Sequence, residues 1–573
     1  MRPNHYRDGS ASCVYRNGRS VKCFCTCPGC IRRPMRAIIE DNQWIWFDNI
    51  TNAEEEILWV EFSVTRPGTY VDPAQRGNWD GIYRKYNRAK KRMARPLLSM
   101  LRGVCEKHKL PLIIKDNREK WPYKKMKVED IKPDFLPGIT LDPHQIRGIQ
   151  AALKVECGVA DVPTGGGKGE IIAGICKAIS CPTVVIADQR IVVEQLKQRL
   201  ELRDVIDDVG LFYAGEKPNG EQIVVGTIQS LTIPSKPPEV PKRTDADTDK
   251  TYAKKLEKWE ISFKGYKTRR KNAKSLQRYV KEAEMLIVDE ADKATSDPFK
   301  NMFRHWFRGR RRYGFSGTCF DDDKPVEGMV MQEHLGSVIV KESRQELQRI
   351  GRIIPVDYYM FAFGLDVKDG IHDQTAYDIA YDEFLVDNQE FHKLIANLCK
   401  KYKGDGTLAL VDRERLGHNL LASISNVGLT SEFIYGKTPK RQRNERLRGF
   451  EKREFDVLIG GKIINRGLDL DGGCENLIVA TGGKLKSDFI QKVGRAVRHN
   501  SRGRSRVFDF FFRCNKYLYD HSRSRLKAMI AAGYKTTIIF PGGSVDGAQL
   551  VKSRFHVRKG LLDSPRKRDI VDR

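Results

Sequence analysis

Short apolar runs rich in β-branched residues recur along the chain from about residue 140, and each ends in a polar loop that leads into a helical stretch. A first set comprises residues 183–187, 221–226 and 285–288. A second set comprises residues 407–411, 455–459, 476–480 and 506–512. Unbroken apolar runs of this length are typical of parallel strands covered by helices on both faces. The pattern therefore predicts an α/β protein with two consecutive parallel-sheet lobes.

The stretches outside these two sets have other patterns. An apolar run at 56–62 predicts a strand, and a basic stretch from Arg84 to about His108 predicts a helix. Residues 234–281 open with four prolines and continue with many Lys and Arg, which predicts an extended arm followed by a basic helix. This insertion in the first lobe either contacts nucleic acid, as a grip or a wedge, or is solvated and has no task.

A chain of 573 residues is too long for one ordinary core, and we expect five parts. These are a basic cysteine-rich segment (1–33), a small α/β accessory domain (34–135), a first lobe (136–345), a second lobe (346–540) and a basic tail (541–573). The tail either adds non-specific affinity for nucleic acid or is idle.

The net charge narrows the class of partner. Lys and Arg number 102 against 74 Asp and Glu, which gives +28. Such an excess suits a phosphate-bearing partner, although a solvated basic surface or anionic lipid would also fit. The sequence has neither a membrane-spanning apolar run nor a secretory signal, and most cysteines are scattered singly. We therefore expect a cytoplasmic protein with reduced thiols, not a secreted or membrane protein.

A glycine-rich loop between a strand and a helix is the strongest local signal. The loop ends in Lys168, and such loops hold phosphates with backbone N–H groups while the lysine reaches the β- and γ-phosphates of ATP. The residue after the lysine is usually a Ser or Thr that binds Mg²⁺, and here it is Gly169. The candidate nucleotide-binding residues of this loop are Pro163, Thr164, Gly165, Gly166, Gly167, Lys168, Gly169 and Glu170.

An apolar strand that delivers two acids at its end supplies a second signal. Asp289 would hold Mg²⁺, and Glu290 would orient and polarise the attacking water. These acids follow the phosphate loop by about 120 residues within the alternating α/β pattern. The pair indicates ATP hydrolysis with magnesium.

With these motifs the chain resembles the superfamily-two helicases of the DEAD/DEAH type, because further motifs follow in the family's order. The resemblance implies that Gln145 reads the adenine, and that Arg190, Thr227 and Gln229 contact the nucleic acid. It implies that Ser316, Gly317 and Thr318 couple hydrolysis to movement. In the second lobe it implies nucleotide-linked roles for Gly467, Asp469, Gln491, Arg495 and Arg498.

The resemblance also implies a mechanism and a fold, two tandem RecA-like lobes. Arg495 and Arg498 of the second lobe would face the γ-phosphate held by the first and would stabilise the transition state only when the lobes close. ATP binding would thus close the lobes and hydrolysis would release them.

The region before the motor resembles, more loosely, the small N-terminal domain of UvsW-type phage helicases, which remodel branched DNA. The resemblance is carried by a loop containing Trp79, a helix with three leucines and a closing strand at 110–118. It implies that Trp79 and a basic face bind duplex or branched DNA, although a solvated surface would have the same composition. The basic face comprises Arg84, Lys85, Arg88, Lys90, Lys91 and Arg92.

Five cysteines crowd into the first thirty residues. Cys27 and Cys30 have the spacing of a zinc knuckle, and two of Cys13, Cys23 and Cys25 could complete four thiolate ligands for Zn²⁺. No second pair has this spacing, so a reduced basic segment without metal is the alternative.

The sequence thus predicts an ATP-dependent DNA helicase or translocase that unwinds or branch-migrates forked and junction DNA, alongside replication, recombination or repair proteins in a bacterial or phage-infected cell. An RNA helicase is the first alternative, because residues 289–292 spell Asp-Glu-Ala-Asp, but Gln491 and Gly317 depart from that branch. Gly169 motivates a nucleotide-gated clamp without turnover. A motor subunit of a restriction or defence system is a further alternative, and it would need a nuclease partner.

Overall fold

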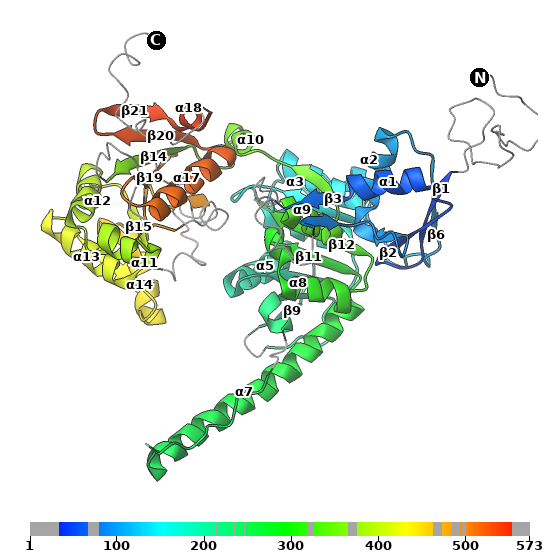
Figure 1. Cartoon of the computed structure of the whole chain (residues 1–573), viewed down its shortest axis with the longest axis horizontal. Helices are drawn as coiled ribbons and strands as arrows, with labels where there is room; N and C mark the ends of the chain where they lie inside the picture. Colours follow the sequence, from blue (N-terminus) through cyan, green and yellow to red (C-terminus); the bar gives the residue numbers. More distant parts are fainter. Residues whose placement is uncertain are drawn as a thin grey trace, which may run out of the picture.

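The computed structural model describes residues 34–66, 80–213, 216–232, 236–245, 247–317, 325–364, 375–461, 473–483, 493–494, 500 and 502–552. Its strands form sheets of four, seven and eight strands and one two-stranded ribbon. Figure 1 shows the two large sheets, each with helices on both faces, and the smaller sheet beside the seven-stranded one. Within these described ranges, no helix is long and apolar enough to cross a membrane.

Lobe one, the unit built on the seven-stranded sheet, has the strand order β13-β7-β12-β11-β8-β10-β9, and all pairs are parallel. The strands are β7 (Cys157–Asp161), β8 (Thr183–Ala187), β9 (Val209–Phe212), β10 (Ile223–Thr227), β11 (Met285–Asp289), β12 (Arg311–Ser316) and β13 (Val338–Lys341). Successive residues of β8 enter different apolar clusters, Val184 on one face and Val185 on the other. This double burial explains why the strand sequences are unbroken apolar runs.

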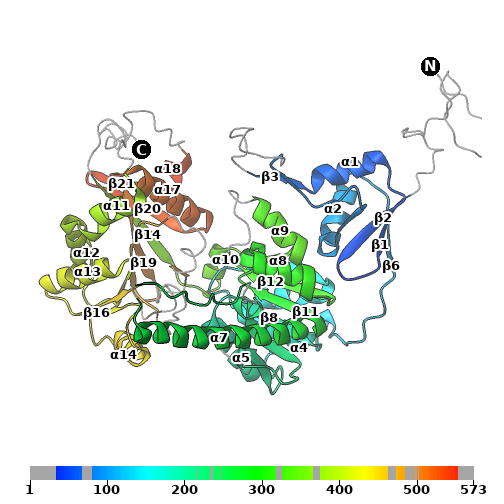
Figure 2. The ribbon, with the colours of Figure 1, turned by 60° about the horizontal axis from the view of Figure 1, so that its bottom comes forward.

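Helices cover both faces of this sheet, and one long helix extends beyond it. They are α3 (Pro143–Lys154), α4 (Lys168–Ala178), α5 (Arg190–Leu202), α6 (Ile228–Leu231), α7 (Asp249–Glu282), η4 (Ala291–Thr295), α8 (Asp297–Asn301), η5 (Met302–Trp306), α9 (Pro325–Leu335) and α10 (Arg344–Arg349). Figures 1 and 2 show α7 running far beyond the body of lobe one.

Lobe two is built on the eight-stranded sheet, ordered β16-β17-β15-β18-β19-β14-β20-β21. Its strands are β14 (Val356–Phe363), β15 (Thr407–Val411), β16 (Ser431–Ile434), β17 (Val457–Gly460), β18 (Asn476–Ala480), β19 (Ser505–Phe512), β20 (Lys535–Phe540) and β21 (Gly543–Asp546). Its helices are α11 (Tyr377–Tyr381), η6 (Asp382–Val386), α12 (Gln389–Lys401), α13 (Glu414–Asn426), α14 (Lys440–Glu451), α17 (Lys516–Ala531) and α18 (Gly547–Lys552). Only β21 is antiparallel, so the sheet continues into the predicted tail.

The N-terminal domain has a small sheet in the order β5-β2-β1-β6. Its elements are β1 (Met35–Ile39), β2 (Trp44–Asp48), α1 (Asn52–Glu61), β3 (Ser63–Thr65), β4 (Ile82–Arg84), β5 (Arg92–Ala94), η2 (Arg95–Leu97), α2 (Leu98–Lys107), β6 (Leu112–Asp116) and η3 (Val128–Asp130). Leu58 of α1 and Leu101 of α2 are fully buried in one core with the sheet. The prediction of an α/β fold with two RecA-like lobes and a small α/β accessory domain is confirmed.

Two local predictions in this domain are wrong. The apolar run at 56–62 lies mostly in helix α1, because Thr51 and Glu54 form a capping box that starts a helix, and Leu58 buries its inner face. The helix expected from Arg84 begins only at Leu98, after Pro96. The residues before Pro96 pair instead with β2, where β5 adds an edge strand.

Candidate nucleotide and nucleic-acid site

The glycine loop joins the end of β7 to the start of α4 on lobe one. Gly165 and Gly167 have φ values of +87° and +76°, which favour glycine, so the loop turns tightly around its own backbone. Lys168 begins α4, and its Nζ donates to the carbonyl of Val162 over 3.3 Å. His144 bonds to the carbonyl of Gly166 over 2.6 Å and supports the loop from α3. The helix N-terminus and the lysine therefore meet at one loop, as phosphate binding requires.

Gln145 lies directly beside this loop. Its Oε1 accepts from the backbone N–H of Asp142 at the start of α3, over 2.9 Å. Its Nε2 is buried and has no hydrogen-bond partner among the described residues. A Cβ added to Gly167 would overlap that Nε2, so the amide donor faces the last glycine of the loop. A buried free donor at this place suits the predicted contact with a nucleotide.

The acidic pair lies at the end of β11, in the middle of the sheet. Asp289 and Glu290 are each 8% exposed, and Glu290 has a φ of +57° that turns the chain sharply into η4. These carboxylates end a strand that is parallel to β7, with β12 between them, so they lie at the same edge of the sheet as the phosphate loop. Two buried carboxylates at this edge suit a hard cation such as Mg²⁺. Asp292 accepts from the Ser316 hydroxyl over 2.8 Å, while burial and the charge of Glu290 raise the pKa of Asp292 to about 6.

The coupling segment after β12 lies against the glycine loop. The backbone N–H of Val162 donates to the carbonyl of Ser316 over 2.9 Å. A Cβ on Gly317 would lie 2.9 Å from the Cα of Pro163, in backbone that cannot rotate away. Glycine at position 317 therefore allows the two segments to touch, which gives a steric reason for the departure from alanine noted in the sequence.

The predicted nucleic-acid contacts connect to this acidic end through Asp188. Lys293 of η4 forms an ion pair with Asp188 over 2.7 Å, and Gln229 donates to the same carboxylate over 3.1 Å. Burial is the largest single influence and lowers the pKa of Lys293, but the hydrogen bond to Asp188 and the charges of the nearby carboxylates together leave that pKa above its ordinary value. Thr227 shares a hydrogen bond of 2.8 Å with Ser230. Asp188 belongs to the same strand-contact motif as Arg190, whereas sequence reasoning gave no role to Lys293.

Arg190 and Glu170 have other surroundings. The Arg190 guanidinium lies over the Tyr213 ring, 4.8 Å from its centroid, and the residue is exposed. The Glu170 carboxylate pairs with Arg199 of α5 over 3.1 Å and with Arg203, directly after α5, over 2.9 Å, and so faces the C-terminal end of α5.

A side chain from helix α5 occupies the space next to Gly169. A Cβ on Gly169 would overlap the Arg199 guanidinium, so an arginine occupies the space where the usual Ser or Thr would project. Arg199 has no motif of its own, and the sequence carried no signal for it.

Lobe two and the segment between the lobes approach the same loop. A Cβ on Gly494, in the predicted arginine motif, would lie 2.9 Å from the Cβ of Thr164. Arg352, just after α10, forms an ion pair with Asp142 over 3.5 Å. A Cβ on Gly165 would lie 2.7 Å from Ile353. The second lobe thus meets the first at the phosphate loop.

Several predicted site residues lie outside the described residues, and their roles stay predictions. They are Trp79, Thr318, Gly467, Asp469, Gln491, Arg495 and Arg498, together with the zinc candidates Cys13, Cys23, Cys25, Cys27 and Cys30. Within the part of the chain that is described, no group of three or more His, Cys, Asp and Glu residues could hold a metal ion.

The basic stretch of the N-terminal domain is largely engaged within the protein. Arg84 and Arg88 lie over the Trp59 ring, and Arg92 lies over Trp44. Lys85 pairs with Glu333 of lobe one, and burial lowers the pKa of Lys85 to about 8. Of the six residues of this predicted face, Lys90 and Lys91 remain exposed without such contacts in the described structure.

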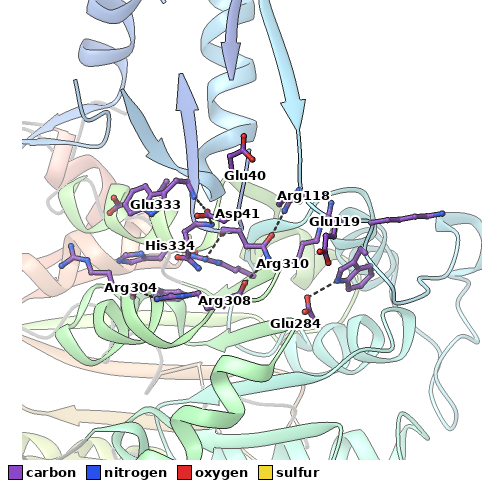
Figure 3. Close-up of a pocket in the computed structure, with 18 of the residues that line it drawn as sticks. Glu40, Asp41, Arg118, Glu119, Glu284, Arg304, Arg308, Arg310, Glu333 and His334 are labelled. Atoms are coloured by element: carbon purple, nitrogen blue, oxygen red, sulfur yellow. Dashed lines mark hydrogen bonds between the residues drawn. The ribbon is translucent and has the colours of Figure 1, made fainter. Parts of the chain in front are cut away.

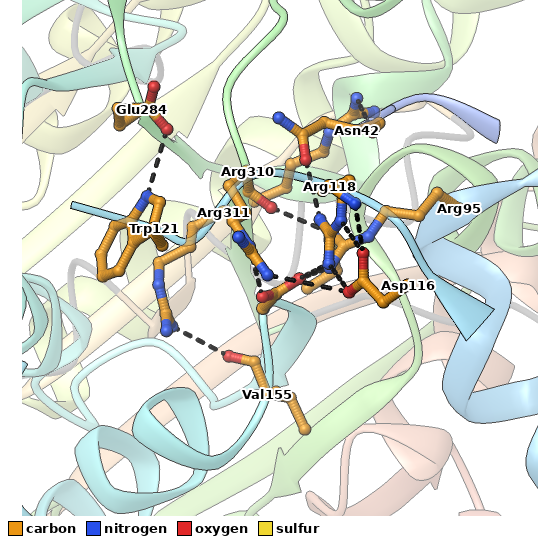
Figure 4. A network of polar contacts seen from close by, with 12 residues as sticks. Asn42, Arg95, Asp116, Arg118, Trp121, Val155, Glu284, Arg310 and Arg311 are labelled. Carbon is orange, nitrogen blue, oxygen red and sulfur yellow. Dashed lines mark hydrogen bonds and ion pairs between the residues drawn. The ribbon is translucent and has the colours of Figure 1, made fainter. Parts of the chain in front are cut away.

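A polar network joins the N-terminal domain to lobe one. Glu156 pairs with Arg310 over 2.6 Å, with Arg118 over 3.1 Å, and with Arg95. Arg118 also donates to Asn42 over 2.7 Å, and Trp121 donates to Glu284 over 3.2 Å (Figure 4). Mostly buried charges with several partners each thus span the boundary between the two units.

A cavity of about 680 Å³ opens beside this network. Figure 3 shows arginines of lobe one and acids of the N-terminal domain projecting into it. His334 lies on its wall, where burial and nearby cations hold the pKa of His334 well below its usual range. The lining contains both cations and acids in similar numbers, so its charge does not favour one sign of ligand.

Two protein families match the chain. The family described as type III restriction enzyme, res subunit, matches residues 138–321, and the helicase conserved C-terminal domain matches residues 389–500. Among curated proteins, the chain is similar to the ATP-dependent RNA helicase DRS1 of Mycosarcoma maydis, 24% identical over 39% of this chain and 24% of that protein. It is similar to putative helicase 22 of Sulfolobus islandicus filamentous virus, 23% identical over 42% of this chain and 44% of that protein.

A third relative is UvrABC system protein B of Xylella fastidiosa, 30% identical over 20% of this chain and 17% of that protein. The chain therefore spans less than half the length of these relatives. Among solved structures, T4 UvsW is 14% identical with a TM-score of 0.39, over 89% of this chain and 99% of that one. A fragment of a putative HsdR subunit from Vibrio vulnificus is 14% identical with a TM-score of 0.47, over 73% of each chain. The two matched families cover much of both lobes in the expected order, and they support the predicted resemblance to the superfamily-two helicases.

Proposed function

We propose that the chain is an ATP-dependent DNA helicase or translocase that unwinds or branch-migrates forked and junction DNA in replication, recombination or repair. The observation that carries a motor rather than a simple ATPase is the contact series from the ATP site to the predicted strand contacts. Asp292 accepts a hydrogen bond from Ser316, and the neighbouring Lys293 forms an ion pair with Asp188. Asp188 in turn accepts a hydrogen bond from Gln229.

The proposed reaction is assigned to the chain's own groups. Lys168 and the loop N–H groups bind the β- and γ-phosphates, and Gln145 donates to the base. Asp289 would hold Mg²⁺, which neutralises phosphate charge when bound. Glu290 orients the attacking water and takes its proton.

Arg495 and Arg498 complete the proposed site from lobe two. They follow Gly494, which packs against Thr164 of the phosphate loop. Their charges would stabilise the transition state only with the lobes closed, so closure and hydrolysis alternate. Because Asp188 bonds both Lys293 and Gln229, a shift of η4 on hydrolysis alters the grip on the strand.

Support for DNA and for branched substrates comes from other residues. Gln491 and Gly317 stand where the RNA-unwinding branch carries histidine and alanine. The N-terminal domain, fixed to lobe one by Glu156, would carry a second DNA contact that moves with the first lobe. Such a rigid pair can hold two arms of a fork at a constant angle while lobe two steps.

The test compares DNA and RNA as activators and then compares substrates. We expect DNA to stimulate phosphate release more than RNA, and matched forks and Holliday junctions to be processed faster than plain duplex. Glu290→Gln should abolish both activities. Stronger stimulation by RNA would favour an RNA helicase, and preference for plain duplex would refute the branched-DNA refinement while leaving a motor.

The match to the restriction-enzyme res family favours a second candidate, a motor subunit of a larger restriction or defence complex. That candidate predicts that the isolated chain hydrolyses ATP slowly even with DNA and needs a partner chain for full activity. Robust fork unwinding by the isolated chain would argue against it.

A further inference from the structure

Helix α7 is much longer than lobe one needs. Its 34 residues span about 51 Å. Its buried residues are Tyr266, Ala273, Leu276 and Val280, all in the C-terminal half. At that end Gln277 donates to the carbonyl of Leu231 at the end of α6, over 3.0 Å. Figures 1 and 2 show the N-terminal half extending away from the lobe.

The extending half is braced by the chain before it. Trp259 donates to the carbonyl of Pro238 over 3.0 Å, and Tyr252 donates to that of Pro241 over 3.3 Å. The Trp259 and Phe263 rings stack with centroids 5.1 Å apart, which continues this packed side of the helix. Prolines and stacked rings reduce the entropy that ordering costs. The arm, defined as α7 with residues 236–245, is therefore a preformed projection.

The free side of the arm is strongly basic. α7 carries twelve Lys and Arg against four Asp and Glu, and all twelve cations are exposed. Among the described residues, only Lys255 and Arg278 of these twelve have ion-pair partners. A helix stabilised for solubility alone usually alternates charges at i,i+4 spacing, whereas like charges at that spacing repel. The excess positive charge costs stability in the free protein and suits a polyanion.

Five cations in the C-terminal half of α7 are aligned. Lys264, Lys267, Lys271, Lys274 and Arg278 recur at spacings of three and four residues, so at 100° per residue they fall within about 80° of the circumference, on the side away from the buried residues of the helix. No Asp or Glu lies between the first and the last of them. This basic stripe runs over about 21 Å, roughly the length of six base pairs.

The arm lies next to the proposed strand contacts. It follows α6, which carries Gln229, and returns to β11, which ends in the catalytic acids. Figures 1 and 2 both show its free end reaching toward the side of lobe two that carries α14. That helix is itself basic, with five Lys and Arg against two Glu. DNA leaving the strand contacts would thus meet positive charge on both sides.

We propose that the basic stripe of α7 binds the phosphate backbone of the DNA duplex next to the strand contacts, as a sequence-independent grip outside the motor. It rests on the proposed function, because the motor must act on DNA for the grip to serve it. The contacts are electrostatic, so they are sensitive to salt and indifferent to base sequence.

The test neutralises the stripe in the full chain. The arm variant is Lys264→Gln, Lys267→Gln, Lys271→Gln and Lys274→Gln together. The matched control removes the same charge from exposed lysines at α12, as Lys393→Gln, Lys400→Gln, Lys401→Gln and Lys403→Gln. Binding is measured against salt concentration on a fork whose duplex arm exceeds about 51 Å, and on a short single strand. Circular dichroism confirms that both variants keep their helices.

For the arm variant we expect at least tenfold weaker fork binding and a salt dependence shallower by about two to four counterions. The control should stay within twofold of the unmutated chain, and hydrolysis stimulated by saturating short single strand should be unchanged in both. Equal effects of the two variants, equal loss on the short single strand, or a larger loss on double-stranded RNA than on DNA would overturn the grip. No DNA stimulation of the unmutated chain would instead remove the proposed function itself.

Discussion

Neutralising Asp188 tests the contact series between hydrolysis and strand binding. Asp188→Asn keeps an oxygen that can accept from Gln229 but removes the charge that holds Lys293. A charge-assisted hydrogen bond contributes about 1.5–3 kcal/mol, and the two side chains are each 27% exposed. Solvent screening reduces this to about 1–1.5 kcal/mol. If the pair transmits strand binding, DNA stimulation of hydrolysis should fall about five- to thirteenfold.

The assay is steady-state phosphate release with and without saturating DNA. Basal hydrolysis should change by less than twofold, because Asp188 does not touch the nucleotide loop. Asp297→Asn serves as the control, since it removes an exposed ion pair with Lys300 on nearby α8.

A double-mutant cycle with Lys293→Met separates this pair from its surroundings. Each single substitution should lower DNA stimulation, and the double variant should be no worse than either. Unchanged stimulation in Asp188→Asn, or additive losses in the cycle, would refute the reasoning.

Three further changes have defined outcomes. Gly317→Ala places a methyl group 2.9 Å from the Cα of Pro163, so ATP hydrolysis should fall at least fivefold. The control Gly103→Ala meets nothing within 4 Å and should have no effect on hydrolysis. Equal activities of the two variants would contradict the steric argument. The double variant Gly169→Ser with Arg199→Gln removes the guanidinium next to position 169 and supplies a hydroxyl there. It should lower the Mg²⁺ concentration needed for half-maximal hydrolysis. An unchanged Mg²⁺ requirement would show that position 169 lies away from the metal. The folded-state pKa of Asp292, about 6, exceeds its ordinary 3.8, so the stability this group supplies is present below pH 3.8 and is lost as pH rises through 6. Asp292→Asn should therefore raise the melting temperature at pH 8 but not at pH 4, and an equal shift at both would contradict the assignment.

The sheets could be predicted because their strands are buried on both faces. An unbroken run such as Thr183–Ala187 fits a strand that is buried on both faces better than an amphipathic helix or a loop. The run at 56–62 could not be assigned in the same way, since its apolar residues fit a strand as well as a helix that buries only Leu58 among them. There the capping residues Thr51 and Glu54 held the deciding information.

The candidate site likewise contains parts that could be predicted from local sequence and parts that could not. Motifs whose residues are adjacent in sequence, such as the phosphate loop and the acids after β11, were visible because local geometry sets their spacing. The Asp188–Lys293 pair joins residues 105 positions apart, and no local pattern marks it. Arg199 filling the space of Gly169, and Gly317 touching Pro163, likewise depend on packing between segments.

The proposed motor depends above all on arginines of lobe two that complete the ATP site on lobe one. Phosphate release by the variants Arg495→Ala and Arg498→Ala tests this dependence most directly. Each variant should bind ATP within a few-fold of the unmutated chain and hydrolyse it about 10³-fold more slowly or worse, as Lys168→Ala also should. Hydrolysis at the unmutated rate in both arginine variants would contradict a site shared between the lobes.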